Sequence, residues 1–219
     1  MTDRPTRRPH PVLLALLGAL LPALASAQAP HPAPGPGPTV LVVIDIQNFY
    51  FPGGAMALVD PLPASLQAKR LLERFRAKGW PVVHVQHLPK GQDTPTPDTG
   101  DESYRIHPNV RPVGGEAVIG KHHANAFRDT DLLAVLRRLG ARRLVVAGMQ
   151  THMCVEATAR YAADLGFEVV VAHDACATRA LKFGPTEVPA PQVHAAALAT
   201  LSGTYARVVS TDELLDELK

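Results

Sequence analysis

The sequence predicts an α/β fold in which helices cover both faces of a mostly parallel sheet. Apolar, β-branched runs alternate along the chain with segments whose apolar residues recur at helical intervals. The runs are apolar on nearly every residue, as is typical of strands buried on both faces. The 219 residues suffice for one such domain with a substantial core, and the sequence contains no internal repeat.

Each element has its own local signal. The run TVLVVIDI over 39–46 predicts the first strand. A helix is expected over 62–78, because apolar residues recur at helical spacing and Gly79 supplies an ending signal. Successive strands joined by helices imply right-handed crossovers. The remaining elements are expected, in chain order, as strands over 81–87 and 116–120, a helix over 130–139, a strand over 143–147, a helix over 151–165, a strand over 167–173, a helix over 191–201, a strand over 206–209 and a last helix from Thr211.

The N-terminal residues 1–27 predict a signal peptide. Three arginines near the start precede an apolar stretch over 12–25, and Ala25-Ser26-Ala27 has the small-residue pattern of a cleavage site. The stretch is shorter than the ~20 residues of a membrane-spanning helix, so a permanent anchor is not expected. We expect export to the periplasm or the medium, by the Sec or the twin-arginine route. A Pro/Ala/Gly-rich leader over 28–38 and a folded domain over 39–219 would follow.

The charge balance excludes several classes of partner. Cleavage after Ala27 removes three arginines and one aspartate from totals of 22 basic and 20 acidic residues, which leaves 19 of each. A nominally neutral chain without a basic run has no electrostatic footprint for nucleic acid or for anionic lipid. We therefore expect a small-molecule substrate, no nucleic acid and no membrane association after cleavage.

A cysteine follows a predicted strand at the point where a helix begins. The strand over 143–147 stops at Gly148, and the helix over 151–165 places Cys154 in its first turn. Unpaired amide N–H groups and the macrodipole of that turn favour a thiolate, so Cys154 is a candidate nucleophile. The alternative is a small buried apolar residue, the commoner role of a free cysteine. A disulfide with Cys176 is a further alternative in an exported protein.

Two charged residues end other predicted strands. Asp45 closes an otherwise apolar strand, and Lys121 follows the short strand over 116–120. Ligands of such sheets bind beyond the carboxyl ends of the strands, where these residues would meet Cys154. Separately, each has an ordinary explanation, since an aspartate often caps a turn and a lysine is usually solvated. Together they supply a base, a cation and a nucleophile for one crevice. The long irregular segment over 88–112 is typical of a lid or binding loop.

At these motifs the sequence resembles the isochorismatase-like cysteine hydrolases, a superfamily that includes nicotinamidase, N-carbamoylsarcosine amidohydrolase and related amidases. The resemblance extends from Thr39 to about Leu215. It is closest to the amidase branch that contains streptothricin hydrolase-like members. The matching motifs are Asp45-Ile46-Gln47, the segment GKHHANAF over 120–127 with Thr130-Asp131-Leu132, the segment GMQTHMCV over 148–155, and Asp174-Ala175-Cys176-Ala177.

The resemblance implies both a fold and a site. The fold would be a three-layer, Rossmann-like arrangement with a six-stranded parallel sheet. Asp45, Lys121 and Cys154 would form a catalytic triad, and a non-proline cis peptide would join Met149 to Gln150. The backbone amides of Gln150 and Cys154 would form the oxyanion hole. Family members are commonly oligomers, so a homo-oligomer is expected.

The implied activity is hydrolysis of a C–N bond in a small amide, ureide or lactam through a thioester. A vinyl-ether hydrolase of the isochorismatase type, a redox protein and a non-catalytic exported binding protein are the alternatives. No metal or other cofactor is expected, because the stretch over 49–54 lacks the histidines of the nicotinamidase metal site. The substrate pocket is expected to include Phe49, Phe51, Tyr104 and His123.

Overall fold

The computed structural model describes residues 1, 37–89, 91–92 and 101–219. Apart from Met1, the predicted signal peptide lies outside the described residues, as does the leader up to residue 36. None of the described helices combines the length and the apolar composition needed to cross a membrane.

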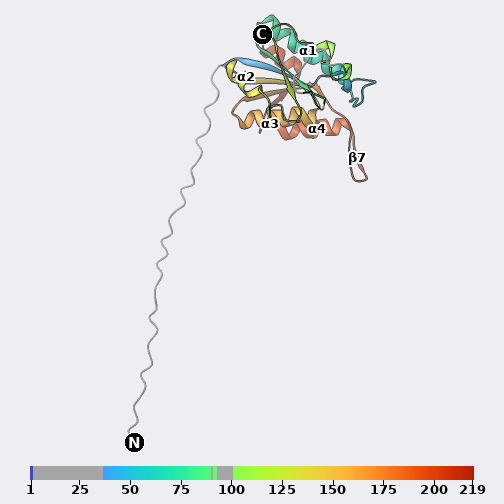
Figure 1. Ribbon diagram of the computed structural model, residues 1–219, viewed down its shortest axis with the longest axis vertical. Coiled ribbons are helices and arrows are strands. Elements are labelled where there is room, and N and C mark those ends of the chain that lie inside the picture. The colour runs from blue at the N-terminus through green and yellow to red at the C-terminus, as the bar shows by residue number, and fades with distance from the viewer. Residues whose placement is uncertain (2–36, 90, 93–100) are drawn as a thin grey trace. The chain divides into compact units, whose positions relative to one another are not determined.

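Six strands form one sheet in the order β3-β2-β1-β4-β5-β8 (Figure 1). Every neighbouring pair is parallel, as the alternation of strands and helices predicts. The two central strands are buried almost throughout, which explains their continuous apolar runs. The strands are β1 (Thr39–Ile44), β2 (Val82–His87), β3 (Ala117–Lys121), β4 (Arg143–Met149), β5 (Glu168–Ala177) and β8 (Arg207–Val209).

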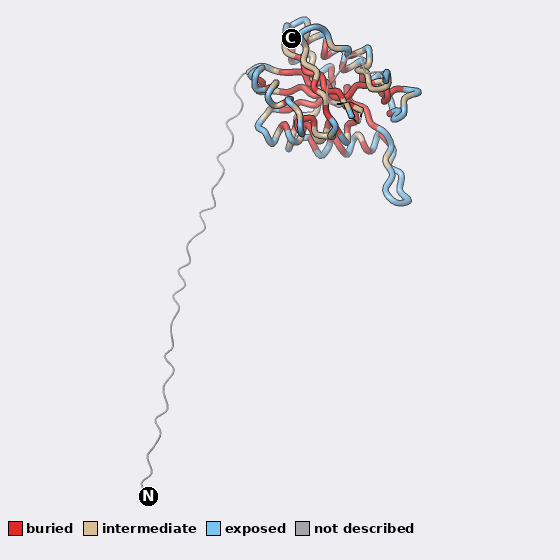
Figure 2. Tube along the Cα trace, in the orientation of Figure 1, coloured by how far each residue is buried: buried red, intermediate tan, exposed pale blue. Residues whose placement is uncertain are grey.

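Helices pack on both faces of this sheet and complete three layers. Side chains of β1 alternate between the faces, with Val40 and Val42 in one core and Leu41 and Val43 in the other. Figure 2 shows the buried residues concentrated along the sheet and the helix faces that cover it. The predicted three-layer α/β fold is confirmed. One face carries α1 (Pro61–Ala77) and α5 (Thr211–Glu217), and the other carries α2 (Leu132–Arg138), α3 (Glu156–Asp164) and α4 (Ala190–Leu201).

The end of β4 requires a glycine. Gly148 pairs with Ile44 of β1, and a Cβ atom at this position would lie 2.1 Å from the Ile44 carbonyl oxygen. Its φ of 149° also lies in a region that other residues rarely adopt. Gly148 therefore allows β1 and β4 to approach closely just before the segment that carries Cys154.

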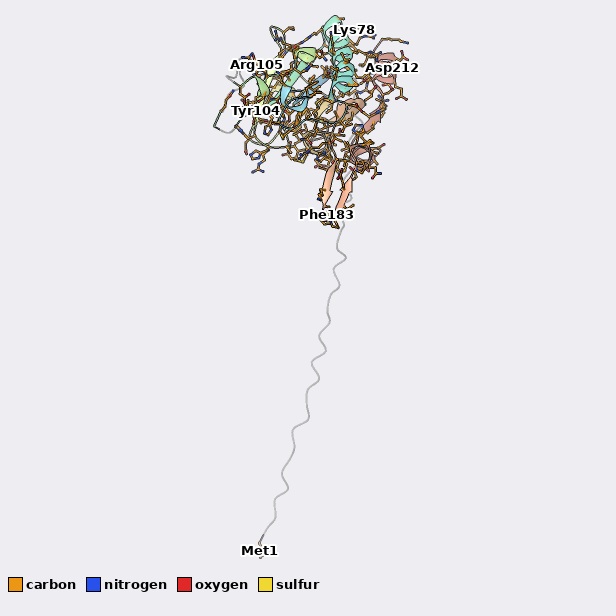
Figure 3. All side chains as sticks on the ribbon, turned by 90° about the vertical axis from the view of Figure 1, so that its right-hand side faces the viewer. Met1, Lys78, Tyr104, Arg105, Phe183 and Asp212 are labelled. Atoms are coloured by element: carbon orange, nitrogen blue, oxygen red, sulfur yellow. The ribbon has the colours of Figure 1, made fainter. Side chains whose placement is uncertain are left out.

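The segment after β5 differs from the sequence prediction. β5 continues to Ala177, four residues further than expected, and a small antiparallel hairpin of β6 (Leu181–Phe183) and β7 (Thr186–Val188) follows. The hairpin projects from the domain, and Phe183 near its tip is 87% exposed (Figures 1 and 3). Three-residue strands are too short to give a clear alternating pattern, which explains why the sequence did not predict them.

A partly buried carboxylate joins α1 and β2 to the loop before β3. Glu116 binds Arg76 at 2.7 Å and His84 Nε2 at 2.8 Å, and it accepts a hydrogen bond from the Val113 N–H at 3.0 Å. Burial alone would raise the pKa of Glu116. The hydrogen bonds from Arg76, Val113 and His84 outweigh this effect and lower the pKa from 4.5 to about 2.

This lowered pKa predicts acid sensitivity. Because the folded-state pKa lies below the unfolded one, Glu116 stabilises the fold above about pH 4.5, and that contribution is lost as the pH falls toward 2. We expect the Glu116→Gln variant to be less stable than the wild type at pH 7, with a smaller further loss on acidification. Urea unfolding of both proteins across this range measures the effect, and identical pH profiles would contradict it.

Candidate active site

The structure brings Asp45, Lys121 and Cys154 into contact. The Lys121 Nζ lies 2.6 Å from Asp45 Oδ2 and 3.2 Å from the Cys154 Sγ. Asp45 follows β1 with a positive φ of 50°, and Lys121 is the last residue of β3. Cys154 lies in a single π-helical turn over Thr151–Val155 that leads into α3. All three residues are buried, with 0%, 1% and 6% of their surface exposed.

Lys121 is held as an ammonium by its surroundings. Burial alone would lower the pKa of Lys121, but the neighbouring Asp45 and Cys154 raise it above its ordinary value. The ammonium also donates to the His123 carbonyl at 3.0 Å and lies 3.4 Å from His87 Nδ1. Burial, and then the Lys121 charge, lower the pKa of His87. The site therefore combines a fixed cation with a neutral imidazole.

The Cys154 thiol keeps its proton in this arrangement. Burial raises the pKa of Cys154 to about 12, with a further upward contribution from the Asp45 carboxylate, and Lys121 offsets these effects only in part. The expectation that the helical turn favours a thiolate is therefore wrong. Burial and a neighbouring carboxylate outweigh the partial charges of one turn. Attack by this sulfur requires a base, and Asp45 is the nearby carboxylate.

The segment before the turn leaves one backbone N–H without a partner in the described residues. The peptide bond between Met149 and Gln150 is cis, as expected. The Gln150 carbonyl accepts hydrogen bonds from the N–H groups of Met153 and Val155, at 3.0 and 3.3 Å, which fixes the turn around Cys154. Within the described part of the chain, the Gln150 N–H donates to no other group. It is available to a ligand beside the thiol.

The aromatic residues expected in the substrate pocket pack against other rings. Phe49 is buried and packs against the rings of Tyr50 and Tyr104, at centroid distances of 4.2 and 5.2 Å. Phe51 stacks on the His107 ring at 3.7 Å, so its ring packs against the long loop. Tyr104 and Arg105 lie on one side of the domain (Figure 3).

His123, which was expected in the substrate pocket, contacts Lys121 through its backbone carbonyl. Its carbonyl holds Lys121, while its half-exposed ring lies 3.4 Å from the Asp129 carboxylate. In the described residues, His, Cys, Asp and Glu side chains do not form a group of three suited to a metal ion.

Sequence reasoning missed Tyr50. It lies in a 3-10 turn over Asn48–Tyr50, directly after the strand that presents Asp45, and its hydroxyl oxygen accepts a hydrogen bond from Gln150 Nε2 at 3.4 Å. Burial raises the pKa of Tyr50, and the neighbouring Asp45 and Cys154 raise it further. Its proximity in sequence to Asp45 was the available signal.

Gln47 ties the long loop to the strand ends. Its Nε2 donates to the carbonyls of His87 and Tyr104 at 2.9 and 2.6 Å, and its Oε1 accepts from the His87 N–H at 2.8 Å. The residue is fully buried. These bonds hold the segment with Tyr104 against the end of β2, close to Lys121.

The Gln47→Leu variant is therefore expected to lose about 2–4 kcal/mol of unfolding free energy, because it leaves buried backbone groups unpaired. Urea denaturation measures this loss. The Gln67→Leu change on the partly exposed side of α1 serves as the control, since in the described residues the Gln67 side chain hydrogen-bonds to Arg70 and to no buried backbone group. Equal stability of both variants would contradict the assigned role.

The second cysteine lies away from the triad. Cys154 and Cys176 are both free thiols. The Cys176 thiol is buried, donates to the Ala172 carbonyl at 3.4 Å, and has a pKa raised to about 12 by that burial. It lines a separate cavity of about 240 Å³ between the first turns of α1 and α4. The structure thus contains no bridge between the two cysteines.

Comparisons with known proteins agree with this arrangement. The model of the isochorismatase domain matches residues 39–213. The crystal structure of a protein from Oleispira antarctica, assigned to the isochorismatase hydrolases, is similar with a TM-score of 0.76 and 47% identity, covering 82% of this chain and 96% of that one.

Two relatives with assigned names are also similar. The secreted isochorismatase effector Isc1 of Verticillium dahliae is 35% identical over 178 residues, which is 80% of this chain and 90% of the relative. Streptothricin hydrolase of Streptomyces noursei is 38% identical over 148 residues, which is 66% of this chain and 51% of the relative. Given the match over nearly the whole described domain, the chain belongs to the isochorismatase family of hydrolases.

Proposed function

We propose that this protein hydrolyses a C–N bond of a small amide, ureide or lactam through a thioester on Cys154. The contact of a buried thiol with both a carboxylate and an ammonium is the observation that carries the proposal. A thiol with a raised pKa becomes a nucleophile when a base removes its proton during attack. The similarity to streptothricin hydrolase supports hydrolysis as the reaction class.

In the first half of the reaction, Asp45 accepts the Cys154 proton as the sulfur attacks the substrate carbonyl carbon. The carbonyl π electrons move to oxygen, and the amides of Gln150 and Cys154 stabilise this oxyanion by about 3 to 4 kcal/mol per donor. The tetrahedral adduct then collapses. The C–N bond breaks, Asp45 returns its proton to the departing nitrogen, and an acyl thioester remains.

Water completes the cycle. Asp45 accepts a proton as the water oxygen attacks the thioester carbonyl, and the C–S bond then breaks to release the acid. The proton returns to the sulfur, so the site regains its starting state. Lys121 stays protonated throughout and stabilises each negative charge that forms on Asp45 and Cys154.

A substrate panel tests the proposal. The purified mature protein is incubated with small primary amides, ureides and lactams, and ammonia or amine release is measured beside the Cys154→Ala variant. We expect thiol-dependent release from at least one C–N class. Turnover of vinyl ethers alone, or turnover that survives loss of the thiol, would overturn the proposal in favour of isochorismatase-type chemistry.

We also propose that the protein is exported. The basic, apolar and small-residue regions over 1–27 support this, as does the similarity to a secreted relative. N-terminal sequencing of the protein recovered outside the cytoplasm should begin at Gln28. Recovery of the intact chain only from the cytoplasm would contradict export. Self-association as a homo-oligomer also stays a prediction, and the molecular mass of the protein in solution would test it.

A further inference from the structure

Only the nitrogen of the Gln150 carboxamide has a hydrogen-bond partner in the described residues. Its Nε2 donates to the Tyr50 hydroxyl oxygen at 3.4 Å. Its Oε1 is buried and has no hydrogen-bond partner in the described part of the chain, and the residue is only 6% exposed. An unpaired buried carbonyl is costly, and native proteins rarely keep one without a reason. The oxygen is therefore positioned for a donor that the protein itself does not provide.

Tyr50 fixes the orientation of this carboxamide. Its ring is buried, with 4% exposed, and burial together with the neighbouring Asp45 and Cys154 raises its pKa, so the phenol stays protonated. Its oxygen already accepts from Gln150, which leaves the hydroxyl hydrogen to be donated elsewhere. Among the described residues no acceptor is placed for it. The Tyr50 oxygen thus orients the Gln150 carboxamide and leaves Oε1 as its free acceptor.

This pair lies beside the reacting atoms. Gln150 directly precedes the turn that carries Cys154, and Tyr50 comes from the turn that follows Asp45. The scissile carbonyl oxygen would occupy the backbone amides, so the side-chain pair would face the neighbouring part of the substrate's acyl group. The free acceptor Gln150 Oε1 matches an N–H group next to the scissile carbonyl, and the Tyr50 oxygen keeps this acceptor in place by binding Gln150 Nε2.

We propose that Gln150 Oε1, held in place by the Tyr50 hydroxyl oxygen, accepts a hydrogen bond from an N–H group on the acyl side of the scissile carbonyl, so that the enzyme selects ureides over carboxamides with a methylene at that position. This inference rests on the proposed C–N hydrolysis. A ureide keeps one N–H after the other nitrogen departs, and this N–H pairs with Gln150 Oε1 throughout the reaction. A methylene cannot donate, and it leaves the buried oxygen unpaired.

The test compares matched substrates in matched variants. N-Alkylureas are paired with carboxamides in which CH₂ replaces the acyl-side N–H, and the ratio of their kcat/KM values is measured. The Gln150→Met variant keeps a similar volume but removes the acceptor, while Tyr50→Phe removes only the hydroxyl. Comparing the ratio between proteins cancels the different intrinsic reactivity of ureas and amides. The Cys176→Ala variant is the control, since Cys176 lies outside the site.

We expect the ureide-to-amide ratio to fall about 10-fold to 100-fold in Gln150→Met and severalfold in Tyr50→Phe, and to stay at the wild-type value in Cys176→Ala. Equal losses on both substrates would show that Gln150 only maintains the turn, and would overturn the inference while the proposed function stands. A wild-type enzyme that cleaves carboxamides but no ureide also overturns it. Absence of all C–N turnover would reject the proposed function itself. If Gln150→Met does not fold, Tyr50→Phe decides the outcome.

Discussion

Replacement of Cys154 by alanine is expected to lower kcat/KM for C–N hydrolysis by about four orders of magnitude or more. The variant has no thiol beside Asp45 and Lys121 to form the thioester. The fold should persist, since alanine fits the space of the small side chain. Substrate turnover and circular dichroism measure the two effects. Cys154→Ser is expected to be nearly as inactive, because an alkoxide is harder to form than a thiolate.

The chain offers a matched control for this prediction. Cys176 is buried to the same extent as Cys154, with 6% exposed, but its thiol donates to the Ala172 carbonyl, and within the described residues no hydrogen bond joins it to Asp45 or Lys121. Cys176→Ala should keep its activity and lose only a modest amount of stability. Comparable activity in the Cys154 and Cys176 variants would show that the reaction needs no nucleophilic thiol.

The Asp45→Asn variant is expected to have a lower turnover but a faster alkylation of Cys154. Turnover should fall by about 10³-fold to 10⁴-fold, because asparagine cannot accept the thiol proton. The pKa of Cys154 should fall as well, since Asp45 raises it while the Lys121 ammonium lowers it. Iodoacetamide should therefore label Cys154 faster at neutral pH in the variant than in the wild type, although the variant is less active.

Peptide mapping after timed alkylation assigns the label to Cys154, and Cys176 in the same sample gives the internal reference. Slower labelling in Asp45→Asn would mean that the carboxylate activates the resting thiol. Unchanged turnover would remove Asp45 from the role of base. Either result would contradict the assignment of Asp45 as the acceptor of the sulfur's proton.

The sequence predicted the fold well because the signal was repeated along the chain. Six apolar runs separated by helical segments leave few arrangements other than a parallel sheet, and parallel sheets place their strand ends at one edge. Asp45 and Lys121 could be assigned to the same crevice as Cys154 for that reason. The distances among these three side chains depend on how the strands are aligned with one another, and this register cannot be derived from the sequence.

Other features of the site depend on three-dimensional surroundings. The protonation state of Cys154 follows from its burial and from the Asp45 charge, and neither was measurable from the position of a helix start. Tyr50 enters the site through a short 3-10 turn that has no periodic pattern. The hairpin over β6 and β7 was missed because its strands are only three residues long.

Partitioning of the acyl group between water and hydroxylamine tests the central claim most directly. Two substrates that share an acyl group but carry different leaving amines are hydrolysed at a fixed hydroxylamine concentration, and hydroxamate and acid are quantified. If both substrates pass through one acyl thioester, they give the same product ratio. A ratio that changes with the leaving amine would contradict a common covalent intermediate on Cys154.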